Sequence, residues 1–305
     1  NRRARCKIPH DCKVTKGIDK SNMTAYTVTY KDGWWYRVSS DPGVVEVQTK
    51  PSTLVELKKN RSRMTGDIFK IAKTLKIEPH EIVGGGHLNI GMLSAFADDP
   101  HLFADFLVDF ANHPELPEGA IDYGDIVNAP ALADQGKKIM KLFDEVITDF
   151  RKGKIAHDPV ALATAVERRV YSKTPSTDGL YNLKYQAMNL RTIVNEEVPT
   201  EEKRAEIRSV RAQLDADEFI LECELFEARM NYLKKLRKAG KPVKFVFPES
   251  ITGPEKGVPA FYKFVIECGE KWEDYRGLMA DHWQTFKFTP SCVKALSKKT
   301  SKDGK

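Results

Sequence analysis

The first fifty residues alternate short apolar runs with turns. The apolar runs lie at residues 26–30, 34–38 and 44–49, and a glycine ends each turn between them. Short apolar runs separated by Gly, Pro and Asp are typical of antiparallel hairpins. The pattern therefore predicts three antiparallel strands within residues 24–51.

Longer stretches follow helical spacing. Apolar residues recur every three or four positions from Leu54 to Leu75, after Ser52 or Thr53 as a helix cap. Residues 94–173 are predicted to be mainly helical, with one apolar stripe from Ile139 to Phe150. A long helix is expected from Asp215 to Gly240, and a final one over residues 260–283.

Four further apolar runs lie at residues 82–92, 180–190, 203–212 and 243–247, and the first three are predicted to be strands. The order of strands, helices, strands and helices predicts an α+β fold.

Composition limits the domain organisation. The 305 residues are 41% hydrophobic and 30% charged, with a net charge of +6, which suits one large or two small domains. We predict a basic tail over residues 1–23, one domain over 24–290 with a helical insertion at about 94–173, and a Lys-rich tail over 291–305. A moderate positive charge attracts phosphates or an acidic partner. Binding of such a partner, or of nucleic acid, through the basic tails is a weaker expectation.

The sequence contains neither a membrane-length apolar run nor the apolar stretch of a signal peptide. Its five cysteines are widely spread and do not form a disulfide framework. We expect a soluble, cytoplasmic protein without a membrane partner.

One candidate site lies on the strand at residues 44–49. Glu46 and Gln48 are two positions apart, so both side chains point to the same face of the strand. Oxygen donors of this kind suit Mg²⁺. The alternative is a charged residue on the wet face of an antiparallel strand.

A second candidate is the run Gly84-Gly85-Gly86-His87-Leu88-Asn89. The glycines permit close backbone approach, and His87 and Asn89 share one strand face. These side chains can bind phosphate or carboxylate groups, although glycines also occur wherever a chain turns tightly.

A third candidate is Arg204-Ala205-Glu206-Ile207-Arg208, followed by Arg211. Arg204, Glu206 and Arg208 fall on one strand face, and guanidinium groups beside a carboxylate suit phosphoryl transfer. The alternative is a solvated ladder of paired charges.

These segments, in this order, resemble the amidoligases and other carboxylate-amine ligases of the glutamine synthetase fold, such as glutamate-cysteine ligase. Residues 41–51 resemble a Glu-x-x-Thr/Ser-Pro strand, and Gly86-His87-Leu88-Asn89 a Gly-x-His-x-His/Asn strand. Lys184-Tyr185-Gln186-Ala187-Met188-Asn189-Leu190 resembles an Arg/Tyr-Tyr-x-x-Leu-Asn-Leu segment. Arg204-Ala205-Glu206-Ile207-Arg208 resembles the Arg-x-Glu-x-Arg strand that follows it. The similarity spans residues 34–238.

The resemblance implies a curved antiparallel sheet of glutamine-synthetase type around ATP and two or three Mg²⁺ ions. It implies an acyl phosphate that an amine converts to an amide, with a peptide or protein among the expected substrates, and it suggests a homo-oligomer. By position it makes Glu46, Gln48 and Glu206 metal ligands and assigns the nucleotide to Gly85, Gly86, His87 and Asn89. It implies that Arg204, Arg208 and Arg211 contact the transferring phosphoryl group, and that Tyr185 and Asn189 contact the substrate.

The family usually opens with a Glu-x-Glu strand, whereas residues 26–30 contain no acid. Fewer anionic ligands weaken a divalent-ion site. Two alternatives therefore stay open: a non-catalytic protein that uses this fold for binding or assembly, and a phosphotransferase similar to the phosphagen kinases.

Overall fold

The chain divides into two compact units. The computed structural model describes residues 12–18, 23–41, 44–77, 79, 85–96, 99–122, 129–174 and 185–288. The N-terminal unit comprises Asn1–Gly84 and Leu214–Ile220, and the C-terminal unit comprises Gly85–Gln213 and Leu221–Lys305. The expected single domain over residues 24–290 thus consists of two units. The predicted tail over residues 291–305 lies outside the described residues.

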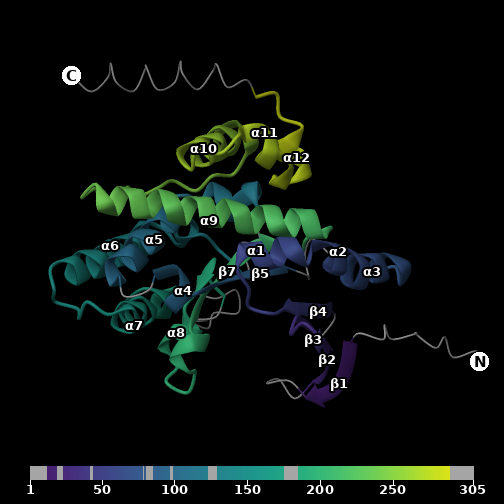
Figure 1. Ribbon diagram of the computed structural model, residues 1–305. Helices are drawn as coiled ribbons and strands as arrows, with labels where there is room; N and C mark the ends of the chain where they lie inside the picture. The colour runs from purple at the N-terminus through teal and green to yellow at the C-terminus, as the bar shows by residue number, and fades with distance from the viewer. Residues whose placement is uncertain are drawn as a thin grey trace, which may run out of the picture. The chain divides into compact units, whose positions relative to one another are not determined.

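The N-terminal unit contains a four-stranded antiparallel sheet in the order β1-β2-β3-β4 (Figure 1). The strands are β1 (Cys12–Ile18), β2 (Thr24–Tyr30), β3 (Trp35–Asp41) and β4 (Val44–Thr49). Three of them confirm the prediction, but β1 lies where a solvated tail was expected. It forms because Val14 pairs with Val28 of β2, which gives the backbone of β2 a partner on its open side.

A helical run follows the sheet, as predicted. It consists of α1 (Leu54–Lys59), α2 (Arg61–Met64), a π-helical turn (Thr65–Phe69) and α3 (Lys70–Thr74). Thr53 and Glu56 form a capping box at its start. The run is tied to the sheet by a hydrogen bond from the Tyr30 hydroxyl to Asp67 and by Arg63, whose guanidinium lies 4.0 Å from the centre of the Tyr30 ring.

The C-terminal unit contains a separate antiparallel sheet in the order β5-β7-β6. Its strands are β5 (Gly85–Gly91), β6 (Met188–Asn189) and β7 (Arg204–Arg211). In the described residues the strands therefore form two sheets rather than one, since β4 leads into helices and β5 pairs with β7 instead. The α+β class with antiparallel strands is confirmed.

Helices cover this sheet and form most of the C-terminal unit. The predicted helical stretch contains α4 (Met92–Phe96), α5 (Pro100–Ala111), a π-helical turn (Leu116–Ala120), a 3₁₀ turn (Leu132–Gln135), α6 (Lys137–Arg151), α7 (Pro159–Arg169) and a 3₁₀ turn (Tyr171–Lys173). Beyond β6 lie α8 (Arg191–Val194), a 3₁₀ turn (Thr200–Glu202) and, after β7, α9 (Ala216–Lys238), whose first residues belong to the N-terminal unit.

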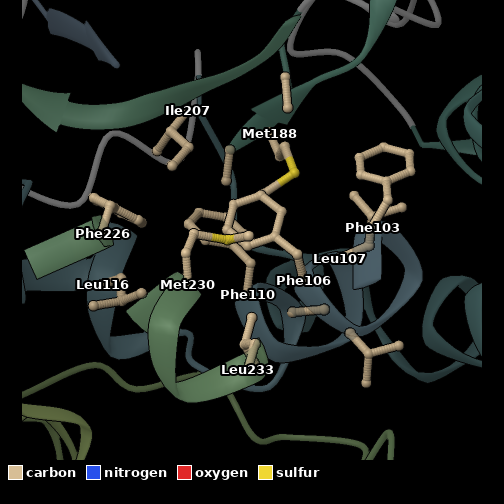
Figure 2. Close-up of a cluster of buried hydrophobic side chains, with 14 of the residues drawn as sticks. Phe103, Phe106, Leu107, Phe110, Leu116, Met188, Ile207, Phe226, Met230 and Leu233 are labelled. Carbon is tan, nitrogen blue, oxygen red and sulfur yellow. The ribbon is translucent and has the colours of Figure 1, made fainter. Parts of the chain in front are cut away.

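The core of the C-terminal unit lies between its sheet, α5 and α9 (Figure 2). Ile207 and Met188 point from the strands toward Phe106 and Phe110 of α5, and Met230 of α9 completes the cluster. Every residue of α5 from Leu102 to Ala111 is buried. A helix that is buried on all sides is a central element of its unit.

The end of the described chain differs from the prediction. The single helix expected over residues 260–283 is divided into α10 (Pro254–Glu267), α11 (Trp272–Tyr275), a 3₁₀ turn (Arg276–Leu278) and α12 (Asp281–Gln284). Gly269, with φ +83°, ends the first of them.

The Trp283 ring of α12 fills a space next to two glycines. A Cβ atom on Gly119 would lie 2.3 Å from this ring, and one on Gly257 would lie 2.0 Å from it. Only a residue without a side chain fits at either position while the indole is in place.

Candidate functional site

The sheet of the C-terminal unit has one polar face. On β5, His87 and Asn89 are exposed, while Leu88 and Ile90 pack against the core. On β7, Arg204, Glu206 and Arg208 are half-buried, while Ala205 and Ile207 are fully buried. The predicted sharing of strand faces is confirmed for both strands.

The strand register brings residues from three distant segments into one row. Asn89 of β5 and Asn189 of β6 both pair with Glu206 of β7. Residues on paired positions of neighbouring strands lie next to one another on the sheet face. Glu206 is therefore the central residue of this group. We call the group the polar row, and it consists of His87, Asn89, Asn189, Arg204, Glu206 and Arg208.

Glu206 receives several polar contacts at one oxygen. Its Oε1 accepts a hydrogen bond from Arg208 Nη1 at 2.8 Å and one from Asn189 Nδ2 at 3.3 Å. His87 Nδ1 lies 4.0 Å from the same oxygen. Burial alone would raise the pKa of Glu206, but His87, Arg208 and Asn189 outweigh it, so the pKa lies below its ordinary value. Glu206 is therefore a carboxylate at neutral pH.

The two arginines of the row have different surroundings. Arg204 Nε donates to Asn89 Oδ1 at 3.0 Å, so it is fixed at the exposed end of the row. The Arg208 side chain is 9% exposed, and its guanidinium lies 5.3 Å from the centre of the Tyr185 ring. Its Nε is buried without a hydrogen-bond partner in the described structure. A buried N–H donor lowers the stability of the fold unless an acceptor pairs with it.

The two glycines assigned to nucleotide binding also differ. A Cβ atom on Gly86 would lie 2.5 Å from the Arg211 carbonyl oxygen, whereas one on Gly85 would meet nothing closer than 3.8 Å. The register shifts between Gly86 and Leu88, where His87 faces two residues of β7. Gly86 is thus required by close packing at this β-bulge.

Arg211 does not belong to the polar row. Its side chain is buried, and Nη1 donates to the Met279 carbonyl oxygen at 3.1 Å, while Nη2 donates to that of Gly277 at 3.3 Å. These bonds fix the backbone before α12. The expectation that Arg211 contacts a phosphoryl group is replaced by this structural role.

Glu46 and Gln48 lie on β4 of the N-terminal unit and share one face of it, as predicted. Gln48 Nε2 donates to Glu46 Oε1 at 2.9 Å. The amide thus presents its nitrogen to the carboxylate, so the pair does not converge two oxygens on one point. Their assignment as metal ligands stays a prediction.

The polar row supplies part of the coordination that a divalent ion with bound substrate needs. His87 and Glu206 offer two ligand atoms, Nδ1 and Oε1, which are 4.0 Å apart. Mg²⁺ is commonly held by one or two carboxylates together with waters and substrate phosphates. No three His, Cys, Asp or Glu side chains of the described chain form a metal-binding group. A phosphorylated ligand would therefore have to complete the coordination.

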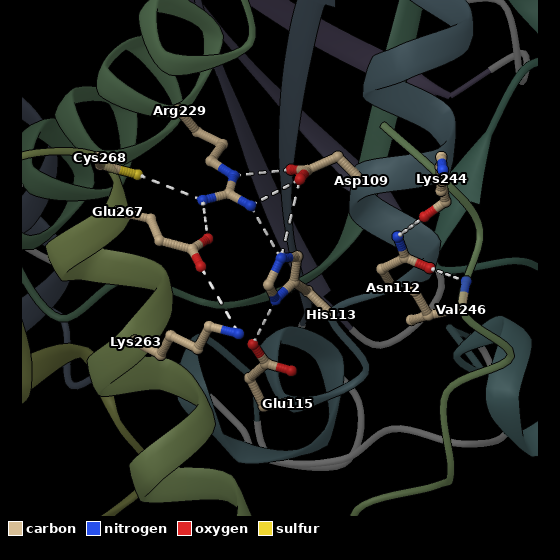
Figure 3. Close-up of polar contacts among 10 residues, drawn as sticks. All are labelled: Asp109, Asn112, His113, Glu115, Arg229, Lys244, Val246, Lys263, Glu267 and Cys268. Atoms are coloured by element: carbon tan, nitrogen blue, oxygen red, sulfur yellow. Dashed lines mark hydrogen bonds and ion pairs between the residues drawn. The ribbon is translucent and has the colours of Figure 1, made fainter. Parts of the chain in front are cut away.

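The sequence did not lead us to a second polar cluster in this unit (Figure 3). Arg229 of α9 binds Asp109 of α5 through two hydrogen bonds of 2.8 and 2.6 Å, and its Nη1 donates to Glu267 of α10 at 3.0 Å. His113 lies between Arg229 and Glu115. Two acids four positions apart in the apolar α5, Asp105 and Asp109, are a signal that could have indicated it, because buried acids need partners.

Comparison with known proteins gives no match: neither a family model, nor a curated protein, nor a solved structure is similar to this chain. Within the described residues, the helices are too short or too polar to cross a membrane.

Proposed function

We propose that the polar row on β5, β7 and β6 binds a nucleotide phosphate with Mg²⁺, and that the chain is an ATP-dependent carboxylate-amine ligase. One observation carries the proposal. Residues of β5, β6 and β7 come together around Glu206, which is contacted by His87, Arg208 and Asn189. In the sequence, β5 and β6 are about 100 positions apart, and β6 and β7 about 20. A ladder of surface charges does not require a histidine and two asparagines on the two flanking strands, β5 and β6.

Each residue of the row has a role in this proposal. His87 and the ionised Glu206 would hold the ion, which would neutralise phosphate charge. Arg204 lies at the exposed end of the row and binds a substrate phosphate or carboxylate. Arg208 balances the charge of Glu206 through its Nη1 hydrogen bond and adds positive charge beside the transferring group. Asn189 and Tyr185 position these side chains.

The proposed reaction has two steps. A carboxylate oxygen of the first substrate attacks the γ-phosphorus of ATP, and the bond to the bridging oxygen breaks, so that ADP leaves with the electron pair. The amine of the second substrate then attacks the acyl carbon. Inorganic phosphate leaves, and the nitrogen loses a proton as the amide forms.

A binding role without catalysis is the second candidate, and the Glu206–Arg208 contact favours it. The guanidinium of Arg208 lies 2.8 Å from the carboxylate oxygen nearest to His87. A divalent ion at this oxygen would be repelled by the neighbouring positive charge. An anionic group alone, such as a carboxylate or a phosphate, would meet no such repulsion at Arg204.

Binding of Mn²⁺ together with a non-hydrolysable ATP analogue separates the two candidates. We expect Mn²⁺ electron paramagnetic resonance to show an ion bound only with the nucleotide, and Glu206→Gln to weaken it at least tenfold. Glu201→Gln, on an exposed acid near β7, is the matched control and should bind normally. Nucleotide binding that is independent of Mn²⁺ and unchanged in Glu206→Gln would contradict the ligase and support the binding role.

A further inference from the structure

The end of α9 and the segment after it carry a group of unpaired lysines. Lys235, Lys238, Lys241 and Lys244 are all exposed. Within the described chain, none of these four ammonium groups has a hydrogen bond or ion pair, whereas Arg237 among them is bound to Asp99 and Asp105. Lysines near a helix C-terminus are favoured by its dipole, but that effect falls off within the last turn. It does not explain Lys241 or Lys244.

The segment beyond the helix exposes an aromatic ring among these charges. Phe247 is 45% exposed and Val246 is 65% exposed. Phe247 has φ +51°, the left-handed region that bulky residues avoid, and it precedes a proline. Its ring lies 4.9 Å from that of Phe245, which packs against Phe143 in turn. Backbone strain at an exposed aromatic residue indicates a constraint other than packing.

Side chains of neighbouring helices hold this segment in an extended form (Figure 3). Asn112 Nδ2 donates to the Lys244 carbonyl oxygen at 2.8 Å, and the Val246 N–H donates to Asn112 Oδ1 at 3.0 Å. Arg151 Nη2 donates to the Val243 carbonyl oxygen at 2.6 Å. The apolar run at residues 243–247 is thus fixed without a strand partner. The backbone that carries Lys244 and leads to Phe247 is therefore held in place.

We propose that this surface, formed by Lys235, Lys238, Lys241, Lys244 and Phe247, binds single-stranded nucleic acid. Proteins that bind single strands without sequence preference combine a line of positive charge along the phosphates with exposed rings on which bases stack. Both elements are present here within thirteen consecutive residues, on residues other than those of the polar row. An extended chain of seven residues spans about 20 Å, a length that can follow several nucleotides.

Fluorescence anisotropy with a labelled 20-nucleotide oligothymidine tests the charge component. We expect the triple variant Lys238→Gln, Lys241→Gln and Lys244→Gln to bind at least tenfold more weakly. The slope of log affinity against log salt concentration should fall by about 2, since each lost phosphate contact on a single strand removes about 0.7.

The control variant is Lys59→Gln, Lys70→Gln and Lys73→Gln, which removes the same charge from exposed lysines of the N-terminal unit. The basic chain ends are unchanged in both variants, so their contribution cancels. Equal losses in the two variants would overturn the proposal, because they would show binding by net charge alone.

Phe247 tests the stacking component. Phe247→Ala should weaken oligothymidine binding roughly 5- to 100-fold, and Phe247→Trp should restore it. Circular dichroism and thermal melting confirm that each variant is folded. Unchanged affinity in folded Phe247→Ala would overturn the proposal. So would tighter binding of phosphatidylserine vesicles than of the oligonucleotide, because the surface would then belong to a membrane.

Discussion

At the scale of single residues, the two neighbouring glycines at the start of β5 allow a matched test. Gly86→Ala places a methyl group 2.5 Å from the Arg211 carbonyl oxygen, so β5 and β7 must move apart. We expect this variant to lose about 1–3 kcal/mol of unfolding free energy. Gly85→Ala meets only ordinary contacts, and its unfolding free energy should change by less than about 1 kcal/mol.

Urea denaturation of both variants measures this difference. If both variants lose the same unfolding free energy, the close contact between Gly86 and β7 is not the reason why position 86 is a glycine. A loss of nucleotide binding in the stable Gly85→Ala variant would instead indicate the ligand contact predicted for this glycine.

The same scale shows what sequence patterns can and cannot predict about a site. The faces of His87, Asn89, Glu206 and Arg208 followed from the two-residue period of strands. Arg211 is three positions after Arg208, an odd spacing that the same period places on the opposite face. The β-bulge pairs Arg211 with Gly85 nevertheless, and its side chain binds backbone near Met279. A bulge depends on the register between strands, which the sequence of one strand does not contain.

At the scale of elements, two ion pairs of different burial make a second matched test. Arg229 and Asp109 join α9 to α5 in the interior, with side chains that are 3% and 5% exposed. Arg61 and Asp217 join α2 to the start of α9 within the N-terminal unit, with side chains that are 56% and 59% exposed. Burial decides what each deletion costs.

We expect Arg229→Ala to lower the unfolding free energy by about 3–5 kcal/mol, because the buried carboxylate of Asp109 loses both guanidinium hydrogen bonds and keeps His113 at 3.7 Å in their place. Arg61→Ala should cost less than about 1 kcal/mol, since water replaces its contact. Chemical denaturation checks both values. The double variant Arg229→Met and Asp109→Leu should recover much of the loss. If it does not, packing rather than the unpaired charge is responsible.

Elements with a clear period were well predicted, and those shaped by tertiary contacts were not. The stripe from Ile139 to Phe150 lies on α6, and the helix expected after Asp215 is α9. β1 was missed because its residues are nearly all exposed, so burial gives it no pattern. The apolar run at residues 243–247 carried no predicted element, and in the structure Asn112 and Arg151 bind its backbone groups.

At the scale of the whole molecule, two groups set opposite pH limits on stability. Burial and then the Asp134 carboxylate raise the pKa of Glu118 to about 8, despite hydrogen bonds from the Ile251 N–H and from Ser250. Burial and then His157 and Arg237 lower the pKa of His101. Glu118 is thus retained as the neutral acid and His101 as the neutral base.

The sign of each contribution follows from these directions. The contribution of Glu118 is complete below pH 4.5, its ordinary pKa, and is lost as the pH rises toward 8. The contribution of His101 is complete above pH 6.5, its ordinary pKa, and is lost as the pH falls below it.

Thermal melting between pH 4.5 and 8.5 measures both effects. Glu118→Gln should reduce the decline in melting temperature on the alkaline side, and His101→Phe should reduce it on the acid side. A profile that neither variant alters would show that these two side chains do not determine the pH dependence.

The position of Trp283 has a consequence for the order of events during synthesis. Its ring occupies the space beside Gly119, which is more than 160 positions earlier in the chain, and beside Gly257, which is about 25 positions earlier. Neither segment can reach its final packing before Trp283 is in place. Segments made first must wait for one of the last described residues to leave the ribosome. Until then the nascent C-terminal unit exposes apolar surface, which is the condition under which chaperones bind.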